Sequence, residues 1–165
     1  MAAKKLSPMP FTKAVMRSFM AESGLEPRLF GPRFRVTGAS SGRVDFELDI
    51  HKDHTNRLQT IHGGTLASLV DLGGSLAVAS TGRFATGVST DLNITYLAPG
   101  GKPGDLLKGT AVCDKIGKTL AYTTVTFTNN KGQLAARGSH TKYVANTMGE
   151  QGPYAAPPEF AEDID

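Results

Sequence analysis

The chain has 165 residues, 39% of them hydrophobic, with 19 glycines and a net charge of +3. This length indicates one globular domain, and the single cysteine, Cys113, excludes an intrachain disulfide framework and favours an intracellular, reducing compartment. We find no run of about 18 uncharged apolar residues and no block of interleaved basic and aromatic residues. We therefore expect no integral membrane segment and no nucleic-acid partner.

Residues 1–24 are predicted to form an N-terminal segment with a short amphipathic helix. Phe11, Val15 and Phe19 recur at helical spacing, which places the helix at about Thr12–Ser23. The first 21 residues hold four basic side chains and no acidic one. That composition is typical of a mitochondrial presequence, although a basic surface helix is the alternative. The expected compartment is therefore cytoplasmic or mitochondrial.

Alternating apolar and polar residues predict strands on both sides of one central helix. Two strands lie between residues 34 and 50, and four more lie at about 88–97, 106–113, 119–128 and 134–144. Their connections are too short for crossover helices, so the sheet is expected to be antiparallel and to curl around the helix. We assign this α+β domain to residues 25–146. The tail, residues 147–165, has no periodicity and is predicted to be disordered.

The central helix carries the strongest chemical signal. Between Thr65 and Thr81 the only charged residue is Asp71, and a helix that is apolar on nearly every side is usually buried. A lone carboxylate in such a helix is a candidate functional group. The preceding His62-Gly63-Gly64 turn offers backbone N–H groups that can bind developing negative charge. The two features together indicate acyl chemistry.

Four motifs occur in order along the chain: His54-Thr55-Asn56, then His62-Gly63-Gly64 followed by Leu69-Val70-Asp71, then the stretch from Gly87 to Tyr96, and Gly117-Lys118-Thr119-Leu120-Ala121. Over about residues 12–146 the chain resembles the hotdog-fold acyl-CoA thioesterases of the phenylacetic-acid-pathway and thioesterase superfamily member 2 type. The resemblance implies a long helix wrapped by an antiparallel sheet, and homodimers or homotetramers with active sites at the dimer interface. It also implies hydrolysis of acyl-CoA without a metal or organic cofactor, CoA being part of the substrate.

The expected catalytic roles follow from this resemblance and from the chemistry of the residues. The Gly63 N–H would polarise the thioester carbonyl. Asp71 would act as a general base toward water or as a nucleophile, and the sequence leaves both open. Ser89, which alternation places on the polar face of its strand with Asp91 and Asn93, would help to hold the water or the thioester. A serine nucleophile is disfavoured because no histidine in the pattern serves it.

Two further residues have an open assignment. Asn56 would orient the water or the carbonyl, but a loop asparagine that makes an Asx turn is the alternative. His62 would position the turn at the helix start, or it is a purely structural histidine.

The helix length itself constrains the site. Gly63 and Asp71 are eight residues apart, which is about 12 Å along a helix, so the two cannot serve the same carbonyl from one helix. A two-fold axis that sets two such helices antiparallel would bring Gly63 of one subunit near Asp71 of the other. We therefore predict an active site shared between subunits.

By resemblance, the CoA-binding residues are Tyr96, Pro99, Lys115, Gly117, Lys118, Thr119 and Lys142, the last within the stretch 140–143. Glycine permits close backbone approach and lysines supply point charges for phosphates. For any single lysine, the alternative is a solvated strand end.

Three other functions remain as alternatives. A metal site would combine His51, His54 and His62 with nearby aspartates, but their spacing is weak for metal binding. A dehydratase or hydratase of the same fold would use His62 facing Asp71. A non-catalytic acyl-CoA-binding protein would need neither group. The sequence leaves open the acyl chain length and the choice between aliphatic and aromatic acyl groups.

Overall fold

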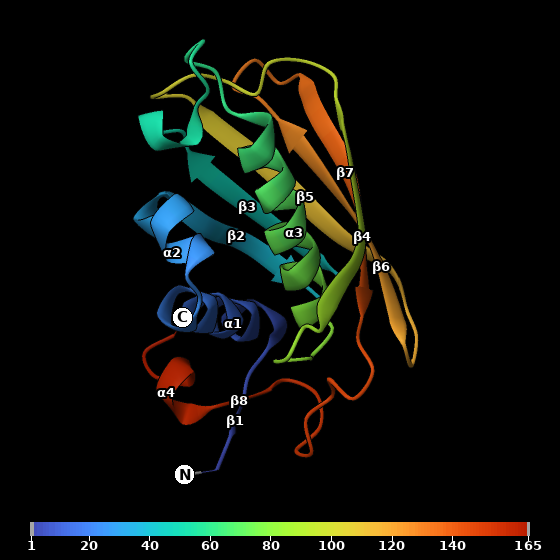
Figure 1. Cartoon of the computed structure of the whole chain (residues 1–165). Coiled ribbons are helices and arrows are strands. Elements are labelled where there is room, and N and C mark those ends of the chain that lie inside the picture. Colours follow the sequence, from blue (N-terminus) through green and yellow to red (C-terminus); the bar gives the residue numbers. More distant parts are fainter. Residues whose placement is uncertain (1, 165) are drawn as a thin grey trace.

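The centre of the fold is a long helix inside a curved sheet. The computed structural model describes residues 2–164, and helix α3 (Gly63–Ala79) lies against one face of a six-stranded antiparallel sheet (Figure 1). The strands are arranged in the order β2-β3-β5-β6-β7-β4. Their bounds are β2 Phe34–Ser40, β3 Arg43–Asp49, β4 Val88–Tyr96, β5 Leu106–Ile116, β6 Leu120–Thr128 and β7 Leu134–Tyr143. The predicted α+β architecture is confirmed.

The core forms where the apolar face of the sheet meets α3. Along β3, Val44, Phe46 and Leu48 are buried and alternate with polar residues, as the sequence pattern predicted. Phe46 packs edge to face against Phe127 of β6, with ring centroids 6.1 Å apart. Burying each such side chain stabilises the fold by about 1.5–3 kcal/mol. The position of α3 is therefore fixed by packing along its length.

Gly74 allows strand β7 to approach α3 closely. A Cβ atom at this position would overlap Nδ1 of His140 and would lie 2.6 Å from Oγ1 of Thr123. The imidazole ring of His140 consequently lies directly against the helix, in the space that the side chain of a larger residue at position 74 would fill.

The helices before the sheet extend further than predicted. Helix α1 (Pro8–Glu22) begins four residues before Thr12, because proline is tolerated in the first turn, where backbone N–H groups need no helical partner. Three short helices precede β2 or follow β3. These are α2 (Leu25–Leu29), η1 (Gly31–Arg33) and η2 (Lys52–His54).

The C-terminal tail differs from the prediction of disorder. Strand β8 (Ala155–Ala156) pairs with β1 (Lys4–Lys5), and helix α4 (Pro158–Ala161) follows it beside α1 (Figure 1). Tyr154 packs edge to face on Phe11, and its hydroxyl donates a hydrogen bond to the Ser80 carbonyl at 2.7 Å. The tail has few apolar residues, but Ala156 and Ala161 are buried, and Tyr154, Phe160 and Ile164 pack partly buried against the core. Composition therefore underestimated its order.

Basic side chains near the N-terminus hold this tail. The Lys5 ammonium donates to the carbonyls of Gln151 at 2.6 Å and Pro153 at 2.8 Å, and Arg17 donates to the Glu162 carbonyl at 2.6 Å. These contacts give the basic residues a structural role. Mitochondrial targeting and the domain boundaries near residues 24 and 146 stay predictions.

Deleting residues 147–165 should destabilise the fold, because Tyr154 and the buried alanines of β8 and α4 would be lost from the core. We expect the free energy of unfolding to fall by about 2–4 kcal/mol in urea titrations. Tyr154→Phe, which removes only the hydroxyl contact, should cost about 1 kcal/mol. The exposed Tyr122 supplies the control variant, Tyr122→Phe, with little expected change. A disordered tail would give equal stabilities for the full and shortened chains.

Candidate active site

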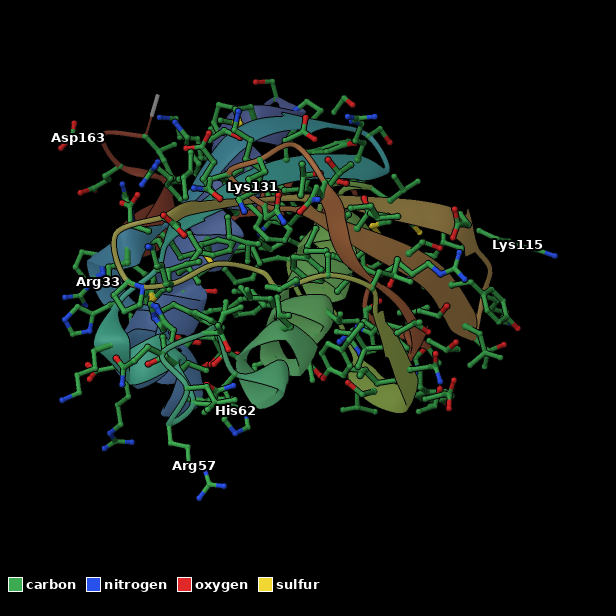
Figure 2. The ribbon with its side chains drawn as sticks, turned by 90° about the horizontal axis from the view of Figure 1, so that it is seen from above. Arg33, Arg57, His62, Lys115, Lys131 and Asp163 are labelled. Carbon is green, nitrogen blue, oxygen red and sulfur yellow. The ribbon has the colours of Figure 1, made fainter. Side chains whose placement is uncertain are left out.

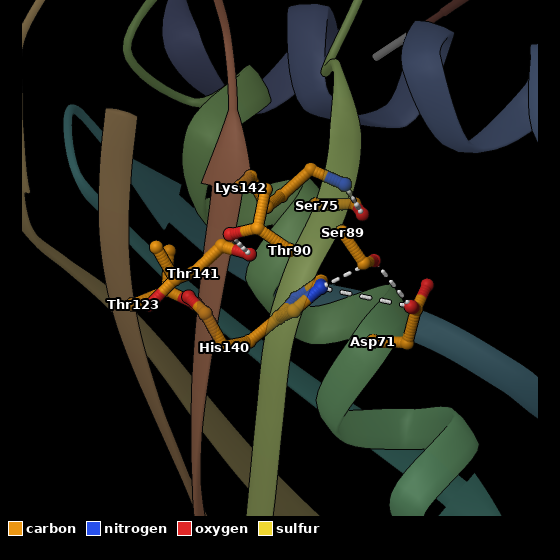
Figure 3. A network of polar contacts seen from close by, with 8 residues as sticks. All are labelled: Asp71, Ser75, Ser89, Thr90, Thr123, His140, Thr141 and Lys142. Atoms are coloured by element: carbon orange, nitrogen blue, oxygen red, sulfur yellow. Dashed lines mark hydrogen bonds and ion pairs between the residues drawn. The ribbon is translucent and has the colours of Figure 1, made fainter. Parts of the chain in front are cut away.

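Three polar side chains meet beside the middle of α3. Asp71 projects from the helix toward the start of β4, where the Ser89 hydroxyl lies 2.9 Å from Asp71 Oδ2 (Figure 3). Nε2 of His140, on β7, lies 2.7 Å from the same hydroxyl and 3.6 Å from Asp71 Oδ2. His140 is fully buried, whereas the Asp71 side chain is 47% exposed. The carboxylate is therefore accessible to solvent on one side, and on its other side it contacts the Ser89 hydroxyl.

The hydrogen positions in this cluster follow from the chemistry of its members. A carboxylate only accepts hydrogen bonds, so the Ser89 hydroxyl must donate its single hydrogen to Asp71. The contact between Ser89 and His140 then requires the ring to be the donor, with its proton on Nε2. The hydrogen bonds run from His140 to Ser89 and from Ser89 to Asp71.

The environment of His140 agrees with this arrangement. Burial is the main cause that lowers the pKa of His140, to about 4, and repulsion by Lys142 adds to it, while Asp71 and Asp91 act in the opposite direction. The ring is therefore neutral near pH 7. With the proton on Nε2, Nδ1 is an unprotonated acceptor, and among residues 2–164 no donor reaches it.

His140 corrects the sequence interpretation of Ser89. The sequence predicted that no histidine serves this serine, yet one is in hydrogen-bond contact with it. The conclusion that Ser89 is not a nucleophile still follows, for a different reason. In a nucleophilic triad the histidine accepts the serine proton, whereas here the histidine donates and Asp71 takes the serine hydrogen.

A β-bulge explains why Ser89 faces the helix. Ser89 pairs with Lys142 and Asp91 pairs with Thr141, so Thr90 is the extra residue. Regular alternation would place Ser89 on the outer face with Asp91, as the sequence predicted. The bulge turns the Ser89 side chain toward α3 instead.

A second group of predicted residues lies at the N-terminus of α3. His62 caps the helix, since its Nδ1 accepts a hydrogen bond from the Gly64 N–H at 2.7 Å. Tyr96, at the end of β4, donates its hydroxyl hydrogen to the Gly63 carbonyl at 2.7 Å. Within residues 2–164 no acceptor takes the Gly63 N–H. This donor is free at the positive end of the helix dipole.

Asn56 lies in the loop that leads to this turn. Its Oδ1 accepts hydrogen bonds from the backbone of Leu58 at 2.9 Å and from the backbone and side chain of Thr60 at 3.3 and 3.2 Å. This is the Asx-turn alternative, and it occupies the side-chain oxygen. A substrate contact by Asn56 would have to use the amide nitrogen.

The predicted CoA-binding residues do not form one cluster within the chain. Lys115, Gly117, Lys118 and Thr119 are exposed around the β5–β6 turn, at the opposite end of the sheet from the α3 N-terminus (Figure 1 and Figure 2). Pro99 follows Tyr96 in the chain, and the neighbouring Gly100 lies against Ile61 and Leu66, close to the start of α3. The Pro99 carbonyl accepts a hydrogen bond from Asn129 Nδ2 at 3.0 Å.

Lys142 does not have the surface position that phosphate binding requires. Only 3% of the residue is exposed, and its ammonium donates to the Ser75 hydroxyl at 2.8 Å. The side chain points into the protein, toward α3 (Figure 3). The sequence motif did not reveal this orientation.

A groove opens beside Asp71. It encloses about 270 Å³ and is lined by Leu25, Glu26, Phe30, Ala67, Ser68, Asp71 and Leu92. The lining is mainly apolar apart from the two carboxylates and one hydroxyl, so the groove offers space for an apolar group beside Asp71.

Neither a membrane span nor a metal cluster is found in the described part of the chain. No helix within residues 2–164 is both long and apolar enough to cross a bilayer. In the same residues, no three His, Cys, Asp or Glu side chains are grouped to hold a metal ion.

Comparison with known proteins identifies the family. The model of the family described as "Thioesterase superfamily" matches residues 58–136. Human acyl-coenzyme A thioesterase 13 is 44% identical over 115 residues, which cover 69% of this chain and 81% of the human protein.

Solved structures agree in fold. Zebra fish thioesterase superfamily member 2 has a TM-score of 0.76 and 38% identity, covering 85% of this chain and 99% of that one. A hypothetical thioesterase protein from Streptococcus pneumoniae, crystallised with coenzyme A, has a TM-score of 0.63 and 27% identity, covering 68% and 88% of the two chains. The chain therefore belongs to the thioesterase superfamily, and its fold is the hotdog fold that the four sequence motifs predicted.

Proposed function

We propose that this protein hydrolyses acyl-CoA thioesters to the free acid and CoA, with Asp71 as the group that activates the attack. The observation that carries the proposal is the asymmetry of the Asp71 carboxylate. Ser89, which His140 holds in turn, donates to Oδ2, while no donor among residues 2–164 reaches Oδ1. One oxygen is fixed and the other is free to act. The human relative named acyl-coenzyme A thioesterase 13 and the coenzyme A in the Streptococcus pneumoniae structure support the choice of substrate.

The reaction uses water and groups of the protein alone. As a general base, Asp71 takes a proton from a water molecule whose oxygen bonds to the thioester carbon. The carbonyl oxygen becomes an oxyanion, which the Gly63 N–H stabilises by about 3–4 kcal/mol. The C–S bond then breaks, the sulfur takes a proton and leaves as CoA, and the acid is released. As a nucleophile, Asp71 would first form a mixed anhydride that water hydrolyses.

The two halves of this site must come from different subunits. Gly63 and Asp71 are both on α3, about 12 Å apart along the helix axis. Strand β4 is an edge strand of the sheet, and Val88 is 64% and Tyr96 52% exposed at its ends. An exposed edge strand is a template for pairing with another chain. We propose a homodimer, or a homotetramer built from it, in which Gly63 of one subunit faces Asp71 of the other.

CoA would extend from this shared site across the surface. Tyr96 and Pro99 lie near the Gly63 end, and Lys115 and Lys118 stand on the exposed β5–β6 turn with Gly117 and Thr119. We propose that these lysines contact the phosphates of CoA. The cytoplasmic or mitochondrial location stays a prediction from the sequence.

The hydratase alternative loses its original basis. Nδ1 of His62 is occupied by the Gly64 N–H, and within one chain this residue lies at the start of α3, away from Asp71. His140 does face Asp71, but it is fully buried behind Ser89 and has no access to a substrate. Among residues 2–164, no contact favours water addition over hydrolysis.

Asp71→Asn should abolish most of the hydrolysis while the fold stays intact. Loss of a general base lowers kcat by about 100- to 10,000-fold. Thiol release from a panel of acyl-CoAs measures the effect, and Asp91→Asn, on the outer face of β4, is the matched control. Binding of acyl-CoA with no thiol release by the unmodified protein would indicate a non-catalytic protein. Water addition to an enoyl-CoA would indicate a hydratase.

Ser89→Ala should slow hydrolysis without stopping it. The variant removes one hydrogen bond to a charged group, which corresponds to about 10- to 100-fold in kcat. Thr90→Ala, at the bulge beside it, should retain most of the activity. If Ser89 were the nucleophile, its removal would eliminate turnover and the acyl-enzyme burst together.

The shared site can be tested by complementation. Gly63→Pro removes the N–H from a helix position that tolerates proline, and Gly63→Ala keeps the N–H with a similar contact to Tyr96. Gly63→Pro and Asp71→Asn should each be inactive. Coexpressed chains should recover about a quarter of the activity, since half the dimers are mixed and each holds one complete site. No recovery in mixed dimers identified by native mass spectrometry would contradict a shared site.

A further inference from the structure

Lys142 is a buried cation to which the proposed reaction assigns no role. It lies on β7 with 3% of its surface exposed, and its ammonium donates to Ser75 Oγ at 2.8 Å. Ser75 is also buried. Placing a charge in the interior is unfavourable unless another group compensates it. Burial lowers the pKa of Lys142, and the attraction of Asp71 partly opposes this effect. The ammonium therefore interacts electrostatically with the proposed catalytic carboxylate.

Lys142 and its partner Ser75 lie next to the Asp71 cluster, on the same strand as His140 and on the same helix as Asp71. His140 and Lys142 are two residues apart on β7, so both side chains point to the α3 side of the sheet. Asp71 and Ser75 are four residues apart on α3, so they lie one turn apart on the same face. His140 contacts Asp71 and Ser89, and Lys142 contacts Ser75 one helical turn further along (Figure 3).

This placement bears on the protonation of His140. The charged groups that act on the ring are Asp71 from α3, Asp91 from β4 and Lys142 from β7 itself. From β6, Thr123 contributes only a hydroxyl, which donates to the His140 carbonyl at 2.7 Å. The two aspartates favour an imidazolium. Lys142 is the one cation in this set, so it opposes a second proton on the ring.

An imidazolium would change the chemistry of the cluster. A cationic ring next to Asp71 would form an ion pair with the carboxylate and would make it a weaker base toward water. A neutral ring donates to Ser89 and leaves the carboxylate charge uncompensated on that side. The proposed hydrolysis needs the neutral form.

We propose that Lys142 is a positioning residue for hydrolysis, whose ammonium, anchored on Ser75, keeps His140 as the neutral donor to Ser89 and so keeps Asp71 available to activate water. This inference rests on the proposed function. It also replaces the assignment of Lys142 to CoA phosphate binding, since the buried ammonium points toward α3.

The test removes the charge and follows His140 directly. Lys142→Met fills the same space with an apolar side chain of similar length, and Lys142→Gln keeps a donor for Ser75 without the charge. The exposed Lys108 supplies the control, Lys108→Gln, with the same change in net charge. The titration of the His140 ring is measured by NMR in each folded protein. Either Lys142 variant should raise its midpoint by about one pH unit or more, and the control should leave it unchanged.

The pH profile of hydrolysis provides the second readout. In both Lys142 variants the acid limb of kcat/KM should move to higher pH by a similar amount, because His140 takes up its proton earlier as the pH falls. A purely structural lysine would lower the activity equally at every pH and leave the His140 midpoint in place, and that result would overturn the proposal. If the unmodified protein releases no thiol from any acyl-CoA, the proposed function fails, yet the NMR titration still decides the electrostatic role. If one of the two Lys142 variants fails to fold, the other variant still tests the proposed role of Lys142.

Discussion

The single hydrogen of the Ser89 hydroxyl determines how the polar cluster beside α3 can work. The hydroxyl lies 2.9 Å from an oxygen of Asp71 and 2.7 Å from Nε2 of His140. Because the carboxylate cannot donate, the hydrogen points to Asp71 and the histidine must supply the other one. A neutral, buried His140 meets this requirement, and its Nδ1 faces Gly74 without a proton. The cluster thus delivers one hydrogen bond, from Ser89, to Oδ2 of Asp71, and no donor among residues 2–164 reaches Oδ1.

Two local features of the backbone make that arrangement possible. The bulge at Thr90 turns Ser89 toward the helix, although regular alternation would turn it away. The missing Cβ at Gly74 lets the ring of His140 lie against α3. Neither feature contributes a side chain to the chemistry. Both features determine whether the side chains that take part in the chemistry can come into contact.

These features also mark the limit of what the sequence could predict. The apolar stretch around Asp71 and the alternation along β3 are local patterns, so the central helix and the positions of the strands along the chain were predictable. The bulge at Thr90 has no signature in residue type, and the contact of His140 with Ser89 depends on the register of two strands 51 residues apart in the chain. The tail was misjudged for a related reason. Its order depends on Ala155 and Ala156 pairing with residues at the other end of the chain.

In the proposed site, one chain positions the groups that activate water, and a second chain supplies the N–H that binds the oxyanion. Asp71, Ser89, His140 and Lys142 are all placed by α3, β4 and β7 of one subunit, and the last two are buried. The hydrogen-bond partners of the base are therefore fixed within the subunit, before substrate arrives. The Gly63 N–H that would receive the oxyanion lies about 12 Å away along the same helix, and in the proposed dimer it comes from the second copy. Changes in subunit pairing would then alter where the carbonyl is held without altering the hydrogen bond that Ser89 donates to the carboxylate.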